Sequence, residues 1–349
     1  MKSAPSATSA RTVNVAVVGL GFMGVTHIRA YRQIASARIV AVCDAVRLPR
    51  DGVLAGVTGN VTGSGDIDLG RNVRVYRALE EVLADPEVEL VDLCVPTPLH
   101  PEHSMAALKA GKHVLCEKPL ALTSLQARGI VQAVQSAPGY FMPAMCMRFW
   151  PGWSWLKQMV AEQTYGKVLT ARFSRLSEAP AWSQATYAKG NENGGALLDL
   201  HIHDTDFVQF LFGRPRRVFS TGASRDGSSI DHVFTQYLYP QGPAVCAEGG
   251  WLLAKGFHMS YTLHCERATL DYDLARGADA LQVVEHGQAP RAVKFEEPDG
   301  YSVETRYLIE AILGSRPPSV VTAQDGLSAL EICEAEARSI RTGAVAEVE

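Results

Sequence analysis

The sequence predicts an α/β protein in which a doubly wound parallel sheet is followed by an α+β domain with a large, mainly antiparallel, open-faced sheet. Three observations carry this prediction. Strand-like and helical stretches alternate through the first half, strand-length pieces follow one another after residue 165, and 349 residues exceed what one simple core usually holds. We therefore expect two domains, over residues 11–147 and 148–349.

In the first half, continuous apolar runs predict strands that are buried on both faces of a sheet. Stretches with apolar residues at helical spacing separate them, and this alternation implies right-handed crossovers with helices on both faces. The expected strands span residues 13–20, 38–44, 90–98, 113–119 and 140–149, and the expected helices span 22–34, 79–85, 101–111 and 124–135. Residues 51–70 are rich in glycine, threonine and serine and predict a surface insertion.

The second half contains strand-length pieces with frequent alternation of polar and apolar residues, separated by glycine, proline and aspartate turns. Such pieces favour an antiparallel sheet with one covered face, whose other face is solvated or pairs with another subunit. The expected strands begin near residues 167, 216, 232, 244, 259 and 268, and two closing helices are expected over residues 303–314 and 323–340.

Composition argues against several classes of protein. The chain has 47% hydrophobic and 20% charged residues and a net charge of -4, which indicates a soluble globular protein without a basic face for nucleic acid. No apolar run approaches the roughly 18 residues that would span a bilayer, and the first dozen residues are typical of a polar tail rather than a signal peptide. The 7 cysteines lie far apart, so we expect free, buried thiols in a reducing cytoplasm.

The first strand-to-helix turn carries a G-x-G-x-x-G motif, GLGFMG, at residues 19–24. Gly19 permits a tight turn, Gly21 lets the backbone approach a pyrophosphate, and Gly24 lets the helix pack on the strand. Backbone amides at the helix start, including those of Phe22 and Met23, then face the phosphates. Because the motif follows a buried strand and opens a helix, it predicts a dinucleotide-binding domain of the Rossmann type.

Asp44 ends the second expected strand, about 20 residues after the motif, where dinucleotide-binding domains place an acidic residue. Its carboxylate can accept hydrogen bonds from the adenosine ribose hydroxyls and would repel a 2′-phosphate, so NAD is favoured. Arg47 and Arg50 follow directly and could pair with that phosphate, which leaves NADP open.

The stretch GGALLDLHIHD, residues 194–204, places acidic and imidazole side chains behind two glycines. If it forms a helix, Asp199 and His203 stand at i and i+4 on one face, whereas His201 points away from His203. Helical zinc pairs use histidines at i and i+4, so this spacing argues against a metal site.

Together these residues resemble the Gfo/Idh/MocA oxidoreductases, the family named after glucose–fructose oxidoreductase and inositol dehydrogenase. GLGFMG with Asp44, TPLHPEHSMAALKAGKHVLCEKPL (97–120), GGALLDLHIHD and the sheet-rich second half match in order, from about residue 11 onward. The resemblance implies NAD(P)-dependent oxidation of a hydroxyl on a sugar, inositol or related polyol. It also implies that Lys118 of the C-E-K-P segment contacts the reacting hydroxyl, and that Asp199 and His203 complete the site.

Oxidation of an alcohol requires these residue types. The hydroxyl proton must leave as hydride departs, and histidine, with a pKa of about 6.5, is a suitable base. A cation stabilises the developing alkoxide. We therefore expect His203 to be the general base, Lys118 the alkoxide-stabilising donor and Asp199 the orienting carboxylate. The roles of Lys118 and His203 could be exchanged, because a buried lysine can have a lowered pKa.

Other residues are expected around the same site. The resemblance places the loop after the third long strand near the cofactor, and the expected cofactor contacts in this loop are Pro96, Thr97 and His100. Glu117 and Lys118, at the end of the next expected strand, are further expected cofactor contacts. His100 could instead only cap or pack. The expected substrate contacts are Arg148, Trp150, Trp182 and His201, although a tryptophan-rich domain junction is as often plain core. His201 stands where family members often have a small residue, which puts the pocket shape in doubt.

Two other functions use the same residues. A glycosidase could oxidise a ring hydroxyl transiently with bound NAD and return the cofactor oxidised. A binding or regulatory protein could have lost catalysis, against which Lys118, Asp199 and His203 argue. For all three, we expect a small-molecule ligand, no nucleic acid or membrane partner, and a homodimer or homotetramer formed through the second sheet.

Overall fold

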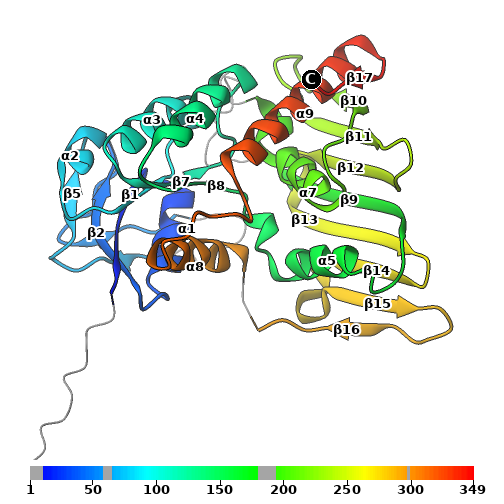
Figure 1. The fold of residues 1–349 in the computed structure, drawn as a ribbon, viewed down its shortest axis with the longest axis horizontal. Coiled ribbons are helices and arrows are strands. Elements are labelled where there is room, and N and C mark those ends of the chain that lie inside the picture. The colour runs from blue at the N-terminus through cyan, green and yellow to red at the C-terminus, as the bar shows by residue number, and fades with distance from the viewer. Residues whose placement is uncertain (1–10, 58–64, 180–193, 297–298) are drawn as a thin grey trace, which may run out of the picture.

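The computed structural model describes residues 11–57, 65–179, 194–296 and 299–349, which form two lobes built on two large sheets (Figure 1). Trp182, expected at the substrate, lies outside the described residues. Among the described residues, no helix is both long enough and apolar enough to cross a membrane.

The first sheet has six strands, all parallel, in the order β5-β2-β1-β6-β7-β8. The chain starts in the middle of this sheet and winds outward to both edges, which confirms the doubly wound fold. The strands are β1 (Val13–Val18), β2 (Ala37–Cys43), β5 (Arg74–Tyr76), β6 (Leu90–Leu93), β7 (His113–Glu117) and β8 (Phe141–Ala144). Strand β5 was not expected, because a three-residue segment is too short to show a pattern.

Helices flank the first sheet as the alternating pattern predicts. They are α1 (Phe22–Tyr31), α2 (Leu79–Ala84), α3 (His100–Lys109), with a 3-10 turn η1 (Thr97–Leu99) before it, and α4 (Ser124–Ser136). Thr123 caps α4 by accepting a hydrogen bond from the amide of Gln126. In the described parts of the segment 51–70, β3 (Val53–Leu54) and β4 (Ile67–Asp68) pair with each other outside the main sheet.

The second sheet has nine strands in the order β16-β15-β14-β13-β9-β12-β11-β10-β17. All neighbours are antiparallel except β9 and β12, so the expectation of a mainly antiparallel sheet is confirmed. The strands are β9 (Val168–Glu178), β10 (Arg217–Ala223), β11 (His232–Leu238), β12 (Ala244–Gly250), β13 (Leu252–Cys265), β14 (Ala268–Asp273), β15 (Leu281–Glu285), β16 (Arg291–Val293) and β17 (Ala346–Glu347). The last three were not expected.

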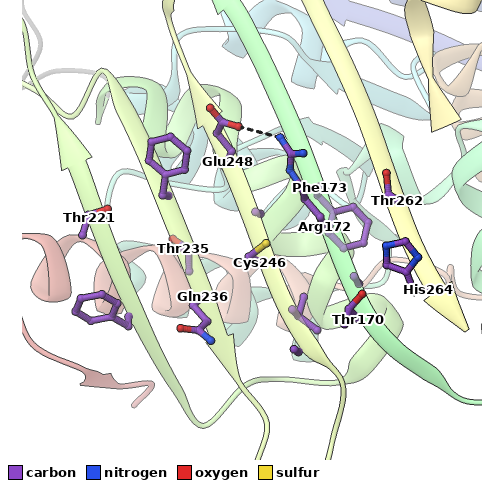
Figure 2. Close-up of a pocket in the computed structure, with 16 residues that line it drawn as sticks. Thr170, Arg172, Phe173, Thr221, Thr235, Gln236, Cys246, Glu248, Thr262 and His264 are labelled. Carbon is purple, nitrogen blue, oxygen red and sulfur yellow. Dashed lines mark ion pairs between the residues drawn. The ribbon is translucent and has the colours of Figure 1, made fainter. Parts of the chain in front are cut away.

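Helices cover one face of the second sheet and leave the other open (Figure 1). Trp153 of α5 (Pro151–Ala161), Phe207 of α7 (Ile202–Phe212) and Ile332 of α9 (Ala323–Thr342) join the sheet residues in one buried core. On the opposite face Phe219 is 36% exposed and Phe234 is 52% exposed. Side chains from several neighbouring strands line a shallow hollow there (Figure 2). The sheet is therefore open-faced, as expected.

The C-terminal helices return to the first lobe. Helix α8 (Gly300–Leu313) packs against α1, and its Leu308, Ile309 and Ile312 belong to the core of the first sheet. Helix α9 places Leu327 and Leu330 in the same core while its other side packs on β10. Division of the chain at residues 147 and 148 therefore separates the two sheets but not the two cores.

Candidate active site

The turn between β1 and α1 leaves an open space above Gly21. Gly19 has φ +91°, and a Cβ there would lie 2.4 Å from the carbonyl oxygen of Cys94; a Cβ on Gly24 would lie 1.9 Å from the oxygen of Gly19. Nothing lies within 4 Å of a Cβ built on Gly21. Close packing thus requires glycine at positions 19 and 24, whereas the structure leaves open space beside Gly21. The half-buried Phe22 and Met23 form the first turn of α1 behind this space.

Asp44 joins the glycine-rich turn to the segment after β2. Its carboxylate accepts hydrogen bonds from the backbone amides of Leu20, Val46 and Arg47, each at 2.8 Å. The Arg47 guanidinium donates to the carbonyl oxygens of Leu20 and Ala55. For Arg47 to reach a 2′-phosphate it would have to exchange these contacts, so its position favours NAD over NADP.

The loops that follow β6 and β7 lie beside this turn. Pro96 is exposed and Thr97 half-buried, but the His100 ring is only 1% exposed. Its Nδ1 lies 2.7 Å from the carbonyl oxygen of Pro119 and its Nε2 lies 2.8 Å from that of Val95. Both ring nitrogens have protein partners, so His100 ties the two loops together. This corrects the expectation that its side chain contacts the cofactor.

Lys118 and Asp199 meet across the two lobes. Lys118 directly follows β7, and its Nζ donates a 2.5 Å hydrogen bond to the backbone oxygen of Asp199 and a 3.1 Å hydrogen bond to Asp199 Oδ1. The Lys118 side chain is 13% exposed and that of Asp199 31%. Lys118 is therefore held at the junction between the lobes with a small part of its surface open.

The segment that carries Asp199 is not a simple α-helix. Leu197–His201 forms a π-helical turn, and α7 begins at Ile202. Such turns are rare and occur frequently at functional sites. The expected i, i+4 geometry of Asp199 and His203 is therefore replaced by a wider turn, although both residues remain within electrostatic reach of Lys118.

Burial and the charges around the site move the pKa values of Lys118 and His203 in opposite directions. Burial lowers the pKa of His203 well below 6.5, and the charges of Lys118 and Arg175 act in the same direction. Burial also works against the charge of Lys118, but the carboxylates of Asp199 and Glu117 outweigh it and raise the pKa of Lys118. At neutral pH the site thus holds a neutral imidazole beside an ammonium group.

Three expected substrate contacts are committed to protein partners. The Arg148 side chain, 2% exposed, donates to both Asp206 oxygens, at 2.8 and 2.6 Å. His201 is 0% exposed, with Nε2 3.3 Å from Glu336 Oε1. Trp150, 9% exposed, packs edge-on against an α8 tyrosine ring. We correct the prediction for Arg148 and His201, because a buried charge or imidazole needs partners inside the protein. Trp150 belongs to the buried core of the second lobe, and its contact with substrate stays a prediction.

A buried polar cluster beneath Lys118 was missed. His27 of α1 lies between Asp92 of β6 and Glu117, of which only Glu117 was expected near the site. A carboxylate in the apolar strand segment LVDL is a signal of a buried partner. His27, Asp92 and Cys94 have ligand-type atoms within 4.8 Å of one another, but His27 Nδ1 and Asp92 Oδ2 are 2.8 Å apart, a hydrogen-bond distance. We interpret this cluster as a hydrogen-bonded network.

All 7 cysteines are free, as expected. Five are buried, Cys94 is half-buried and Cys246 is exposed on the open face of the second sheet, so the expectation of burial fails at that position. Strand alternation explains the exception, because Cys246 stands between inward-facing Val245 and Ala247.

Sequence comparison gives two family matches that follow each other along the chain. Residues 13–144 match the description "Oxidoreductase family, NAD-binding Rossmann fold", and residues 153–271 match the "GFO/IDH/MocA C-terminal domain". Trans-1,2-dihydrobenzene-1,2-diol dehydrogenase of Mus musculus is 30% identical over 177 residues, covering 48% of this chain and 51% of the relative. Levoglucosan dehydrogenase of Pseudarthrobacter phenanthrenivorans is 29% identical over 209 residues, covering 58% and 52%. This chain thus matches about half the length of these relatives.

Solved structures share the whole fold. Levoglucosan dehydrogenase in complex with NADH and levoglucosan superposes with a TM-score of 0.82 at 20% identity, covering 97% of this chain and 100% of that one. Aldose-aldose oxidoreductase from Caulobacter crescentus, complexed with glycerol, gives a TM-score of 0.80 at 21% identity, with coverage of 97% and 100%. At this identity the likeness establishes the fold.

Proposed function

The chain belongs to the GFO/IDH/MocA oxidoreductase family, and on this premise we propose that it is an NAD(P)-dependent dehydrogenase of a CH–OH group on a sugar, inositol or related polyol. One observation carries the proposal. A lysine from the nucleotide-binding lobe and an aspartate–histidine segment from the other lobe meet at the carboxyl end of the first sheet. Ligands of doubly wound sheets bind at this end.

The proposed cofactor is NAD, and the residues present fit it. Open space beside Gly21 supports approach of a pyrophosphate to the start of α1, and Asp44, which directly follows β2, would accept hydrogen bonds from a ribose. When bound, NAD supplies the acceptor for the hydride. NADP remains the alternative, since Arg47 and Arg50 follow Asp44. Pro96 and Thr97, in the loop after β6, border the same edge of the sheet and are proposed cofactor contacts.

The protein side of the reaction follows from the protonation states. His203 is neutral at physiological pH and accepts the hydroxyl proton. Lys118 keeps its ammonium charge and donates from Nζ to the oxygen on which negative charge develops. Asp199 holds Lys118 in place through Oδ1 and its backbone oxygen. Since the pKa of Lys118 is raised and that of His203 lowered, the exchanged assignment of the two roles is disfavoured.

The test is a turnover assay with a panel of sugars, inositols and their acids, in which the absorbance of the reduced nicotinamide measures the reaction. We expect NADH to accumulate in proportion to oxidised product. A glycosidase that uses NAD transiently would form product while the nicotinamide returns oxidised, and a regulatory protein would bind NAD without turnover of any substrate. Either result would reject the proposal.

We further propose a homodimer or homotetramer assembled through the open face of the second sheet. The hollow in Figure 2 has a volume of about 670 Å³, and apolar atoms of Phe219 and Phe234 contribute to its lining beside the Arg172–Glu248 ion pair. A second copy that presents the same face could cover these rings.

Seven free thiols support a reducing compartment, so we place the protein in the cytoplasm.

A further inference from the structure

His27 lies between two carboxylates beneath the proposed active site. It stands one turn into α1, with 0% of its side chain exposed. Its Nδ1 is 2.8 Å from Asp92 Oδ2, and its Nε2 is 3.3 Å from Glu117 Oε1. Nδ1 is at hydrogen-bond distance from Asp92, whereas Nε2 makes no hydrogen bond within the described residues and faces Glu117 at ion-pair distance. Two carboxylates at these distances stabilise a charged ring. Burial works against that charge, but Asp92 and Cys94 raise the pKa of His27 well above 6.5, which favours an imidazolium ion.

Glu117 connects this imidazolium to Lys118. Its Oε2 accepts a 3.0 Å hydrogen bond from the backbone amide of Lys118, while Oε1 faces His27. Lys118 in turn reaches Asp199 in the other lobe. Charges of alternating sign therefore run from Asp92 inside the first sheet, through His27, Glu117 and Lys118, to Asp199 at the lobe junction. Each charge has an oppositely charged neighbour, as buried ions require.

The other titratable groups around His27 do not replace its charge. Tyr31 of α1 and Tyr301 of α8 are buried, and burial raises the pKa of each. Cys94 Sγ lies 3.4 Å from Asp92 Oδ1, and burial raises the pKa of this thiol. Glu304 of α8 is fully buried with neither oxygen hydrogen-bonded within the described part of the chain, and burial raises its pKa as well. Phenol, thiol and carboxyl groups are neutral when protonated and never cationic, so none of these four side chains can supply a positive charge opposite Glu117.

We infer that His27 is a positioning residue of the proposed dehydrogenase: as a buried imidazolium it holds the Glu117 carboxylate in place, and Glu117 thereby fixes Lys118. The inference rests on the proposed function. Without His27, Asp92 and Glu117 would lose the side chain that lies between them, and Glu117 would lose one of the contacts that hold it. Loss of the charge or place of Glu117 would move Lys118 relative to the reacting hydroxyl, and small displacements of catalytic groups are costly.

A double-mutant cycle tests whether His27 acts through Glu117. The variants are His27→Gln, Glu117→Gln and the double variant, with His103→Gln of α3, outside this cluster, as the matched control. We expect His27→Gln to lower kcat about tenfold or more, with KM changed less than about threefold, and to have no further effect in the Glu117→Gln background. Effects that multiply independently in the double variant would overturn the inference, as would a kcat equal to that of the control.

A second readout needs no turnover. The pH dependence of Lys118 acetylation by acetic anhydride, measured by peptide mass spectrometry, gives the apparent pKa of its ammonium. Because Glu117 raises this pKa, we expect it to fall in His27→Gln and in Glu117→Gln to the same extent. An unchanged or higher value in His27→Gln would reject the inference. If the wild-type protein had no dehydrogenase activity, the proposed function would be rejected. The apparent pKa of Lys118 would then still test whether His27 acts on Lys118.

Neutron diffraction of the wild-type protein provides a test that does not depend on the folding of any variant. Deuterium on both ring nitrogens of His27 is the expected result. Deuterium on only one nitrogen at neutral pH would contradict the imidazolium and with it the inference.

Discussion

Alanine substitution at two glycines of the same turn should have opposite effects on stability and cofactor binding. A Cβ on Gly24 would lie 1.9 Å from the oxygen of Gly19, roughly 1.5 Å short of the 3.4 Å at which ordinary contact begins. Overpacking of this kind costs about 1–3 kcal/mol. Gly21 has φ -69° and ψ -161°, which alanine adopts without strain, and open space surrounds its Cβ position. Gly21→Ala should therefore fold with unchanged or slightly higher stability.

For cofactor affinity, the larger effect is expected at Gly21 rather than at Gly24. A methyl group on residue 21 would occupy the space through which a pyrophosphate approaches the start of α1. Loss of one charge-assisted hydrogen bond costs about 1.5–3 kcal/mol, or roughly tenfold to a hundredfold in affinity. Thermal unfolding and titration with NADH by fluorescence measure the two quantities. An NADH affinity of Gly21→Ala equal to that of the wild type would refute the proposed pyrophosphate site beside Gly21. A stability of Gly24→Ala equal to that of the wild type would refute the packing argument.

Three further predictions follow from the site and the open sheet. His203→Ala should lower kcat about a hundredfold or more with unchanged NADH affinity; unchanged turnover would reject His203 as the base. Because burial, Lys118 and Arg175 lower the pKa of His203, kcat/KM should stay level as the pH falls to 6.5 and decline only below it; an acid limb centred above about pH 7 would contradict this. Phe234→Glu should reduce the mass measured by light scattering to that of one chain, whereas a monomeric wild type would reject the proposed interface.

Local patterns were sufficient to predict most of the first lobe. Strand β1 is buried on both faces, so its continuous apolar run is enough to predict it. One strand–helix–strand unit sets the spacing from the glycine turn to Asp44, so distance along the chain is enough to predict the place of Asp44. The meeting of Lys118 with Asp199 joins segments that are far apart in sequence. Periodicity along the sequence does not show which surfaces of the two lobes contact each other. The contact between Lys118 and Asp199 was therefore expected only from the family resemblance.

The errors have a common physical origin. The apolar stripe of α8 shows that the helix is buried but not that it packs on α1 in the first lobe rather than on the nearer sheet. The polar groups of Arg148 and His201 suggested a ligand, whereas Asp206 and Glu336 satisfy them inside the protein. Local sequence does not show which distant carboxylate pairs with a buried cation. The π-helical turn at Asp199 depends in the same way on tertiary packing.

A crystal structure with NADH and a substrate polyol tests the central claim most directly. The account predicts that the hydroxyl oxygen next to the nicotinamide ring lies within about 2.6–3.2 Å of both Lys118 Nζ and a ring nitrogen of His203. A nicotinamide ring bound away from these two side chains, or a substrate hydroxyl in contact with neither, would contradict it.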